Sequence, residues 1–315
     1  MKELNISNLE VGKFYVFQIE FDKHIYIGRY VYTYRNKIAI ENINDQRVIS
    51  LTCNDILKIY HYNVVSFIGL PFAYNGPCAT IAGVGEIYNR LIMKYNEAII
   101  FNLIKQNENQ SAINYLDDIL NLCEKSNIKN TVFMGGNHLS VLPLHKYAKN
   151  AGLCSIILDA HRDYSENLIN EEITHANFLS YIEDLSNVVI YGYRDGKGQI
   201  NSYNSCKTFC VEQEKQFFCC INELKKKGFQ FYVDIDLDVL DPHCFPATNC
   251  PIHNGIIFEN LMKIIEFIGF ENIKYFSIEE YNPYLGDISC SDLIENIFMN
   301  IIKGWNIYDN RINNS

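Results

Sequence analysis

Two patterns of apolar and polar residues divide the chain. Over residues 1–62, runs rich in β-branched and aromatic residues alternate in part with polar ones, as in VGKFYVFQIEF, HIYIGRYVYTY, KIAIENI and RVISLT. Partial alternation with a period of two is typical of strands that have one buried face, and short polar breaks join the runs. The pattern predicts a small β-rich module, an antiparallel barrel or sheet, over residues 1–62.

From residue 64 onward, short apolar strands alternate with stretches of helical spacing. The strand candidates are residues 64–72, 130–134, 154–159, 187–192, 207–211, 229–235 and 273–278. Helical spacing covers residues 85–99, 111–125, 221–228 and 258–268. This alternation predicts an α/β fold with three α/β/α layers, in which helices cover both faces of a central parallel sheet. We expect residues 63–315 to form one catalytic domain.

Composition and charge narrow the class of protein. The net charge is −10 and no dense Lys/Arg block occurs, which argues against a nucleic-acid partner and favours a cationic small molecule. The eleven cysteines include no CxxC pair, so reduced thiols in a cytoplasm are expected. Neither a signal peptide nor an apolar run of membrane-spanning length is evident, so we expect a soluble, cytoplasmic protein without a membrane partner.

Polar clusters follow three of the predicted strands. Ligands bind beyond the carboxyl ends of the strands in open α/β sheets, so these positions are candidates for chemistry. Alternate residues of an extended chain project to the same face, which brings Asp159 near His161 and Asp236 near Asp238. The clusters GGNHLS, DAHRD and DLDVLDP contribute His138, Asp159, His161, Asp163, Asp236 and Asp238.

This set of side chains predicts a pair of bound cations. Four carboxylates gathered at one edge of a sheet repel one another, because burying unpaired like charges costs several kcal/mol each. Two divalent cations would balance the four aspartates. The set is rich in oxygen and contains no cysteine, which favours Mn(II) over a thiolate zinc site. Each motif alone is weak, but the three in this order, each at a strand end, are a strong signal.

The motifs GGNH, DAHRD, DLDVLDP followed by PATNCP, and IEEYNP together resemble the ureohydrolase family of arginases, agmatinases and formiminoglutamases. The resemblance runs from about residue 64 to the C-terminus and includes SFIGLPFAYNG and the following GVGEIYNRL. It implies an arginase-like fold and a metal-dependent hydrolase that acts on the C–N bonds of linear amidines. It also implies a homo-oligomer, a trimer or a hexamer.

The resemblance assigns a role to each candidate. It implies two Mn(II) ions per chain, of which one would be held by His138, Asp159, Asp163 and Asp236 and the other by Asp159, His161, Asp236 and Asp238. Asp159 and Asp236 would then bridge the two ions. His175 in THANFLS matches the proton-shuttling histidine of the family, and Glu280 in SIEEYNP matches the glutamate that anchors the guanidinium group.

Departures from the family pattern leave the substrate open. No expected metal ligand is affected by the changed positions, which are Asn137, Ala176, Asp234, Asn249 and Cys250. The segment YGYRDGKG resembles the family's G-x-R-D-x-D, which marks Asp195 and Lys197 as substrate-binding candidates. Arginases use the later acid to hold an α-amino group, and Lys197 would repel that group. Free L-arginine is therefore disfavoured.

Several substrates and two other functions stay open. The candidates are agmatine, guanidino acids, formimino compounds and peptide-bound arginine, which would be converted to ornithine. Formiminoglutamate hydrolysis at the same metal centre would release formamide instead of urea. A catalytically silent binding or regulatory homologue is the alternative from another class, although the retention of His175 and Glu280 counts against it. The N-terminal module either fills its own small core with aromatic residues or captures a peptide along a strand edge.

Overall fold

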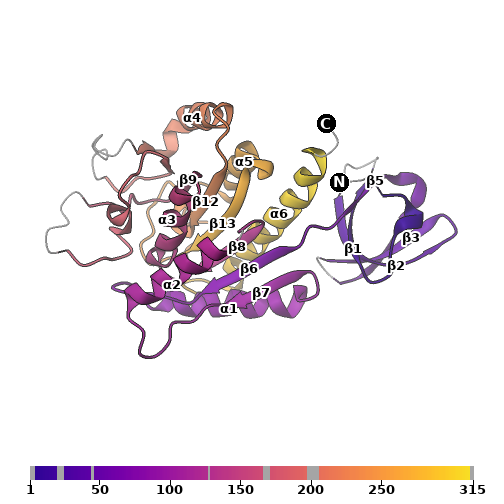
Figure 1. Cartoon of the computed structure of the whole chain (residues 1–315), viewed down its shortest axis with the longest axis horizontal. Coiled ribbons are helices and arrows are strands. Elements are labelled where there is room, and N and C mark those ends of the chain that lie inside the picture. The colour runs from indigo at the N-terminus through magenta and orange to yellow at the C-terminus, as the bar shows by residue number, and fades with distance from the viewer. Residues whose placement is uncertain are drawn as a thin grey trace.

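Two β-sheets organise the chain in the computed structural model (Figure 1). The structure describes residues 4–19, 25–43, 46–126, 128–165, 171–196 and 206–312. An antiparallel sheet of five strands forms an N-terminal module, and a parallel sheet of eight strands forms the core of the remainder. No helix among the described residues is long and apolar enough to cross a membrane.

The N-terminal module contains short, strongly paired strands. They are β1 (Phe14–Ile19), β2 (Ile25–Tyr34), β3 (Lys37–Asn42), β4 (Val48–Thr52) and β5 (Ile56–His61), in the order β4-β3-β2-β1-β5. Alternate residues such as Phe17, Ile38 and Ile40 are fully buried in a core of the module's own. Apolar alternation along β-branched and aromatic runs is what gives a small sheet one dry face. The predicted antiparallel arrangement is confirmed.

The large sheet is entirely parallel. Its strands are β6 (Val65–Leu70), β7 (Ile99–Leu103), β8 (Thr131–Gly135), β9 (Cys154–Leu158), β10 (Val188–Tyr191), β11 (Lys207–Phe209), β12 (Phe231–Asp236) and β13 (Ile273–Glu279). The order across the sheet is β11-β10-β9-β12-β13-β8-β6-β7. Strands buried on both faces are nearly continuous apolar runs, as in CSIIL of β9.

Helices cover both faces of this sheet. They are α1 (Ala79–Tyr95), α2 (Ala112–Lys125), α3 (Leu142–Asn150), α4 (Glu214–Lys226), α5 (Phe258–Ile268) and α6 (Ile288–Ile312). Successive strand residues point to opposite faces. Val132 accordingly lies in the core shared with α1, α4, α5 and α6, whereas Phe133 lies in the core shared with α2 and α3. The predicted three-layer α/β/α fold is confirmed.

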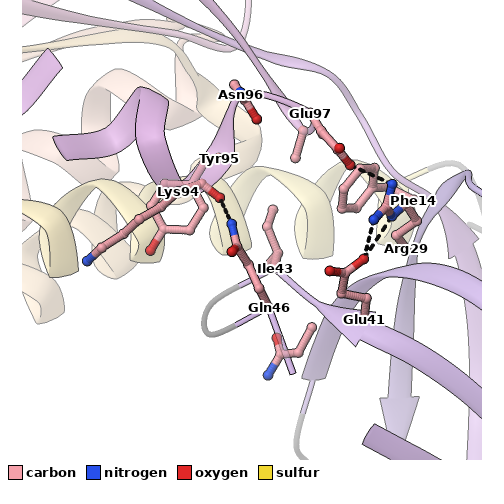
Figure 2. Close-up of a pocket in the computed structure, with 11 residues that line it drawn as sticks. Phe14, Arg29, Glu41, Ile43, Gln46, Lys94, Tyr95, Asn96 and Glu97 are labelled. Carbon is pink, nitrogen blue, oxygen red and sulfur yellow. Dashed lines mark hydrogen bonds and ion pairs between the residues drawn. The ribbon is translucent and has the colours of Figure 1, made fainter. Parts of the chain in front are cut away.

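The module lies at the amino-terminal edge of the large sheet (Figure 1). Arg29 of β2 pairs with Glu97, just before β7, at 2.7 Å. Gln46 donates a hydrogen bond to the carbonyl of Lys94 near the end of α1. Figure 2 shows Arg29 between Glu41 and Glu97 at the wall of a cavity of about 130 Å³. Because the strands are parallel, the module and the carboxyl ends of the strands lie at opposite edges of the sheet.

Candidate active site

Four neighbouring strands bring the predicted site residues together. The strands β9, β12, β13 and β8 are adjacent in the sheet, so their carboxyl ends meet at one edge. Asp159 follows β9, Asp236 ends β12, Glu280 follows β13, and His138 begins the short 3-10 helix His138–Val141 after β8. The chain order alone does not reveal this adjacency, because β12 lies between β9 and β13.

The first group of side chains surrounds one ring nitrogen. His138 Nδ1 lies 2.9 Å from Asp163 Oδ2 and 3.2 Å from an oxygen of both Asp159 and Asp236. It makes a well-formed hydrogen bond to none of them. One imidazole nitrogen offers a single proton or a single lone pair, so it cannot satisfy three carboxylates. Three oxygens and one nitrogen directed at one point fit a divalent cation.

The second group shares a carboxylate with the first. His161 Nδ1 lies 2.8 Å from Asp238 Oδ2 and 3.6 Å from Asp159 Oδ1. The ligand atoms of these three residues lie within 4.8 Å of one another. Oδ2 of Asp159 therefore faces the first group, at His138, and Oδ1 faces the second group, at His161. Asp236 reaches the first group with Oδ2, while its Oδ1 accepts the backbone N–H of Asp238.

The pKa shifts among the six candidate ligands, which we call the buried cluster, are those expected where bound cations would replace protons. Burial raises the pKa of Asp163 to about 7, and the charge of Asp159 adds to this effect. Burial also raises the pKa of Asp236 well above its ordinary value. Burial alone would lower the pKa of His161, but the nearby carboxylates of Asp159 and Asp238 prevail and raise it to about 12. The cluster thus retains protons that cations would displace.

A buried acid contacts the second ring nitrogen of the candidate ligand His138. Asp234 Oδ2 lies 3.0 Å from His138 Nε2 and 2.7 Å from His145 Nε2. Ser277 donates a hydrogen bond of 2.8 Å to the other oxygen of Asp234. All four side chains are buried. Such a partner fixes the orientation of a ligating imidazole, so that Nδ1 of His138 faces the carboxylates.

We expect Asp234→Asn to weaken Mn(II) binding by about 10- to 100-fold, because the amide keeps the shape but removes the charge behind His138. Calorimetric titration of metal-free protein measures this affinity. Ser277→Ala is the matched control, because it removes a partner of Asp234 and leaves the contact with His138. Equal affinities in Asp234→Asn and the wild type would contradict the supporting role.

Glu280 is held in an unusual conformation. Its backbone φ is +65°, in the left-handed region that a glutamate rarely occupies, and Asp163 is similar at +44°. Glu280 Oε1 accepts the backbone N–H of His138 at 2.8 Å, and its own N–H donates to Gly136. Burial raises the pKa of Glu280 to about 7. The side chain is thus fixed beside the cluster.

His175 lies against Gly76, which also adjoins Asn137, the residue before His138. A Cβ at Gly76 would lie 2.5 Å from His175 Nδ1 and 2.7 Å from the side-chain nitrogen of Asn137, so a larger residue there would displace these side chains. Burial lowers the pKa of His175, and the charge of His138 lowers it further. A neutral imidazole beside the cluster can accept or transfer a proton near neutral pH.

The structure describes one of the two substrate-binding candidates, Asp195, but not the other, Lys197. Asp195 is paired with Arg162, whose Nη2 lies 3.1 Å away, and Arg162 in turn stacks on the ring of Tyr193. Lys197 lies outside the described residues.

Asn249, a departure from the family pattern, accepts a hydrogen bond of 2.8 Å from the side chain of Asn282. The changed residue thus ties its loop to the segment that follows Glu280.

Comparison with known proteins decides the family. The sequence model of the arginase family matches residues 90–302, which is more than half of the chain. The chain belongs to the arginase family. All six candidate metal ligands, His175 and Glu280 of this arginase-family chain lie within the matched residues.

Individual relatives of this arginase-family chain are distant. The agmatinase of Bacillus anthracis is 31% identical over 151 residues, which cover 45% of this chain and 51% of the relative. The chain thus spans about half the length of the curated relatives it matches. The solved arginase of Bacillus subtilis has a TM-score of 0.63 at 21% identity and covers 77% of this chain and 99% of its own. The formimidoylglutamase of the same species has a TM-score of 0.65 at 15% identity, with 78% and 87% covered.

The raised pKa of Asp163 predicts how the metal-free protein responds to pH. A carboxyl whose folded-state pKa is about 7, against an ordinary 3.8, stabilises the fold below the lower value and loses this contribution as pH rises through about 7. For chelator-treated protein, we expect the difference between the Tm of the wild type and the Tm of Asp163→Asn to decrease as the pH rises from about 5 to about 8. Thermal denaturation of both proteins measures the difference. A difference that is constant or rises with pH would refute the assignment.

Proposed function

We propose that this arginase-family chain is a hydrolase with two divalent cations, which cleaves a small guanidino compound to urea and an amine. The observation that carries the proposal is the pair of His/Asp groups joined by Asp159, with Glu280 held beside them. A buried cluster of this kind is costly for stability alone, because its carboxylates repel one another. A role in catalysis would explain why the chain retains the cluster despite this loss of stability.

The cations would be held by the six predicted ligands. The first would take His138, Asp159, Asp163 and Asp236, and the second Asp159, His161 and Asp238, with Asp236 as a further bridge. The oxygen-rich set favours Mn(II). When bound, a pair of divalent cations lowers the pKa of water towards neutrality and so supplies the nucleophile.

The chain's own residues orient the substrate and move the proton. Glu280 would hold the planar guanidinium cation by charge-assisted hydrogen bonds, which fixes the central carbon towards the cluster. The backbone N–H of His138 occupies only one oxygen of Glu280. The departing amine needs a proton, and the imidazole of His175 would transfer it. Its lowered pKa keeps His175 neutral until it receives that proton.

The position of the module favours a free small substrate. The module lies at the amino-terminal edge of the sheet, whereas the site lies at the carboxyl-terminal edge (Figure 1). A peptide captured by the module would therefore be held away from the site of the same chain. Among the curated relatives are agmatinases and a guanidinobutyrase. These names support a guanidino compound without an α-amino group, such as agmatine or a guanidino acid.

A substrate panel tests the proposed function. Protein loaded with Mn(II) is incubated with agmatine, guanidino acids, L-arginine, an arginine-containing peptide and formiminoglutamate, and urea, formamide and amine are measured. Urea from a guanidino compound supports the proposal. Formamide from formiminoglutamate alone would establish the other hydrolase, and turnover of none with both cations bound would favour the silent homologue.

We further propose that the module over residues 1–62 is a separate unit that contributes to a homo-oligomer and not to chemistry. A truncation starting at Asn63 should keep kcat/KM on the best small substrate within about threefold, because the module and the site lie at opposite edges of the sheet. Light scattering should show a smaller assembly. Circular dichroism checks the fold, since truncation exposes Tyr95 and Ala98. Loss of activity only on peptides would instead support peptide capture.

A further inference from the structure

A second cluster of metal-ligating side chains lies on the loop of residues 241–256, which links the end of the β12 segment to α5. The two ends of the loop are bonded to each other. Asp241 donates its N–H to the carbonyl of Ile256 at 2.9 Å, and the N–H of Gly255 donates to Asp241 Oδ2 at 3.0 Å. These bonds hold Asp241 against Gly255 and Ile256 at the base of the loop, which we call its neck.

Three side chains converge at this neck. The ligand atoms of Asp241, His243 and His253 lie within 4.8 Å of one another. His243 Nδ1 is 2.7 Å from Asp241 Oδ1, and the two imidazole rings are 5.4 Å apart between centroids. Both histidines are exposed, so a dissolved ion can reach them directly. Among the described residues, this is the one such group that contains neither His138 nor Asp159 of the candidate active site.

The backbone at the neck is already ordered. Arg194 donates to the carbonyls of Ile252 at 2.7 Å and His253 at 3.1 Å, which fixes one end of the loop. The N–H of His243 donates to Asp241 Oδ1 at 2.9 Å, which fixes the other end. Because both histidine backbones are fixed, a ligand has little chain entropy to remove when it binds.

The donor set indicates the class of ion. Two imidazole nitrogens and one carboxylate oxygen suit borderline transition-metal ions such as Zn²⁺, with water as a further ligand. The buried cluster is different, because aspartate oxygens outnumber imidazoles there and favour Mn(II).

We propose that Asp241, His243 and His253 form a surface divalent-cation site, selective for Zn²⁺-like ions and separate from the buried cluster. The same loop holds the segment after Glu280, because Ala247 accepts the N–H of Asn282 at 2.8 Å. The proposed site therefore lies on the same loop as a residue that borders the segment after Glu280. The cation site does not depend on which reaction the buried cluster catalyses.

Zinc uptake by untagged, full-length protein saturated with Mn(II) tests the proposal. Zn²⁺ is added at neutral pH, unbound metal is removed, and zinc and manganese are both measured by elemental analysis. Wild type should gain one zinc per chain without losing manganese. His243→Gln and His253→Gln should each raise the Kd for Zn²⁺ at least about tenfold, because each removes one of three protein ligands. Glu266→Gln, an exposed carboxylate on α5, is the surface-charge control.

Thermal denaturation gives a second measurement. Zn²⁺ should raise the Tm of the Mn(II)-saturated wild type and should not raise that of the His243→Gln, His253→Gln double variant. Zinc uptake that equals manganese loss, or equal zinc uptake by the double variant, would overturn the proposal. If manganese fails to bind while zinc uptake still depends on the two histidines, the proposed hydrolase fails and the surface site stands.

Discussion

Glu280→Gln is expected to abolish turnover while the metal content stays unchanged. Glutamine keeps the size of the side chain but removes the negative charge that would hold a guanidinium cation. The oxygen that accepts the N–H of His138 can be retained by the amide. We expect kcat/KM to fall by about 10³-fold or more, because both orientation and charge stabilisation are lost.

The neighbouring Glu279 provides a matched control for this measurement. Burial raises the pKa of Glu279 well above its ordinary value, and the charge of Asp234 adds to the effect, so a negative charge on Glu279 is disfavoured. Glu279→Gln should therefore leave most of the activity. Kinetics on the best substrate and manganese analysis of both variants test the difference. Wild-type kinetics in Glu280→Gln would show that this residue does not orient the substrate.

Asp159→Ala is expected to remove both cations and all measurable turnover. Asp159 contributes Oδ1 to the group of His161 and Oδ2 to the group of His138, and among the described residues it is the one that both groups share. Asp163→Ala should have a smaller effect on metal content, because Asp163 contacts only the first group. Elemental analysis after dialysis measures the stoichiometry.

Circular dichroism and thermal denaturation must accompany that analysis, because Asp159 also accepts the backbone N–H of His161 at 2.6 Å. A folded Asp159→Ala protein that keeps two manganese ions would contradict the shared ligand. A folded protein that keeps one would show that the remaining ligands of one group hold an ion without Asp159.

Sequence patterning predicted the layers of the fold but missed one strand. The helical stretch predicted over residues 85–99 ends at Tyr95 in the structure, and Ile99–Leu103 forms β7. A short apolar run cannot be assigned to helix or strand by periodicity alone. In addition, β7 is an edge strand with alternating exposure, so it lacks the continuous apolar run of the central strands.

The six candidate ligands could be predicted because each follows a strand whose carboxyl end faces the same edge. Their supporting partners could not. Asp234 contacts His138 across 96 positions of sequence, and the contact exists only because the sheet order brings β12 and β8 to the two sides of β13. His145 carries no motif of its own. Its role becomes visible only through its 2.7 Å contact with Asp234.

The location of the module also determines how the protein can be attached to a support. An anchor introduced on the module would fix the amino-terminal edge of the large sheet to the surface (Figure 1). The carboxyl ends of β8, β9, β12 and β13 would then point towards the bulk solution. Immobilisation through the N-terminal part of the chain should therefore leave diffusion to the site unobstructed, whereas attachment through the loop of residues 241–256 would bring the site close to the support.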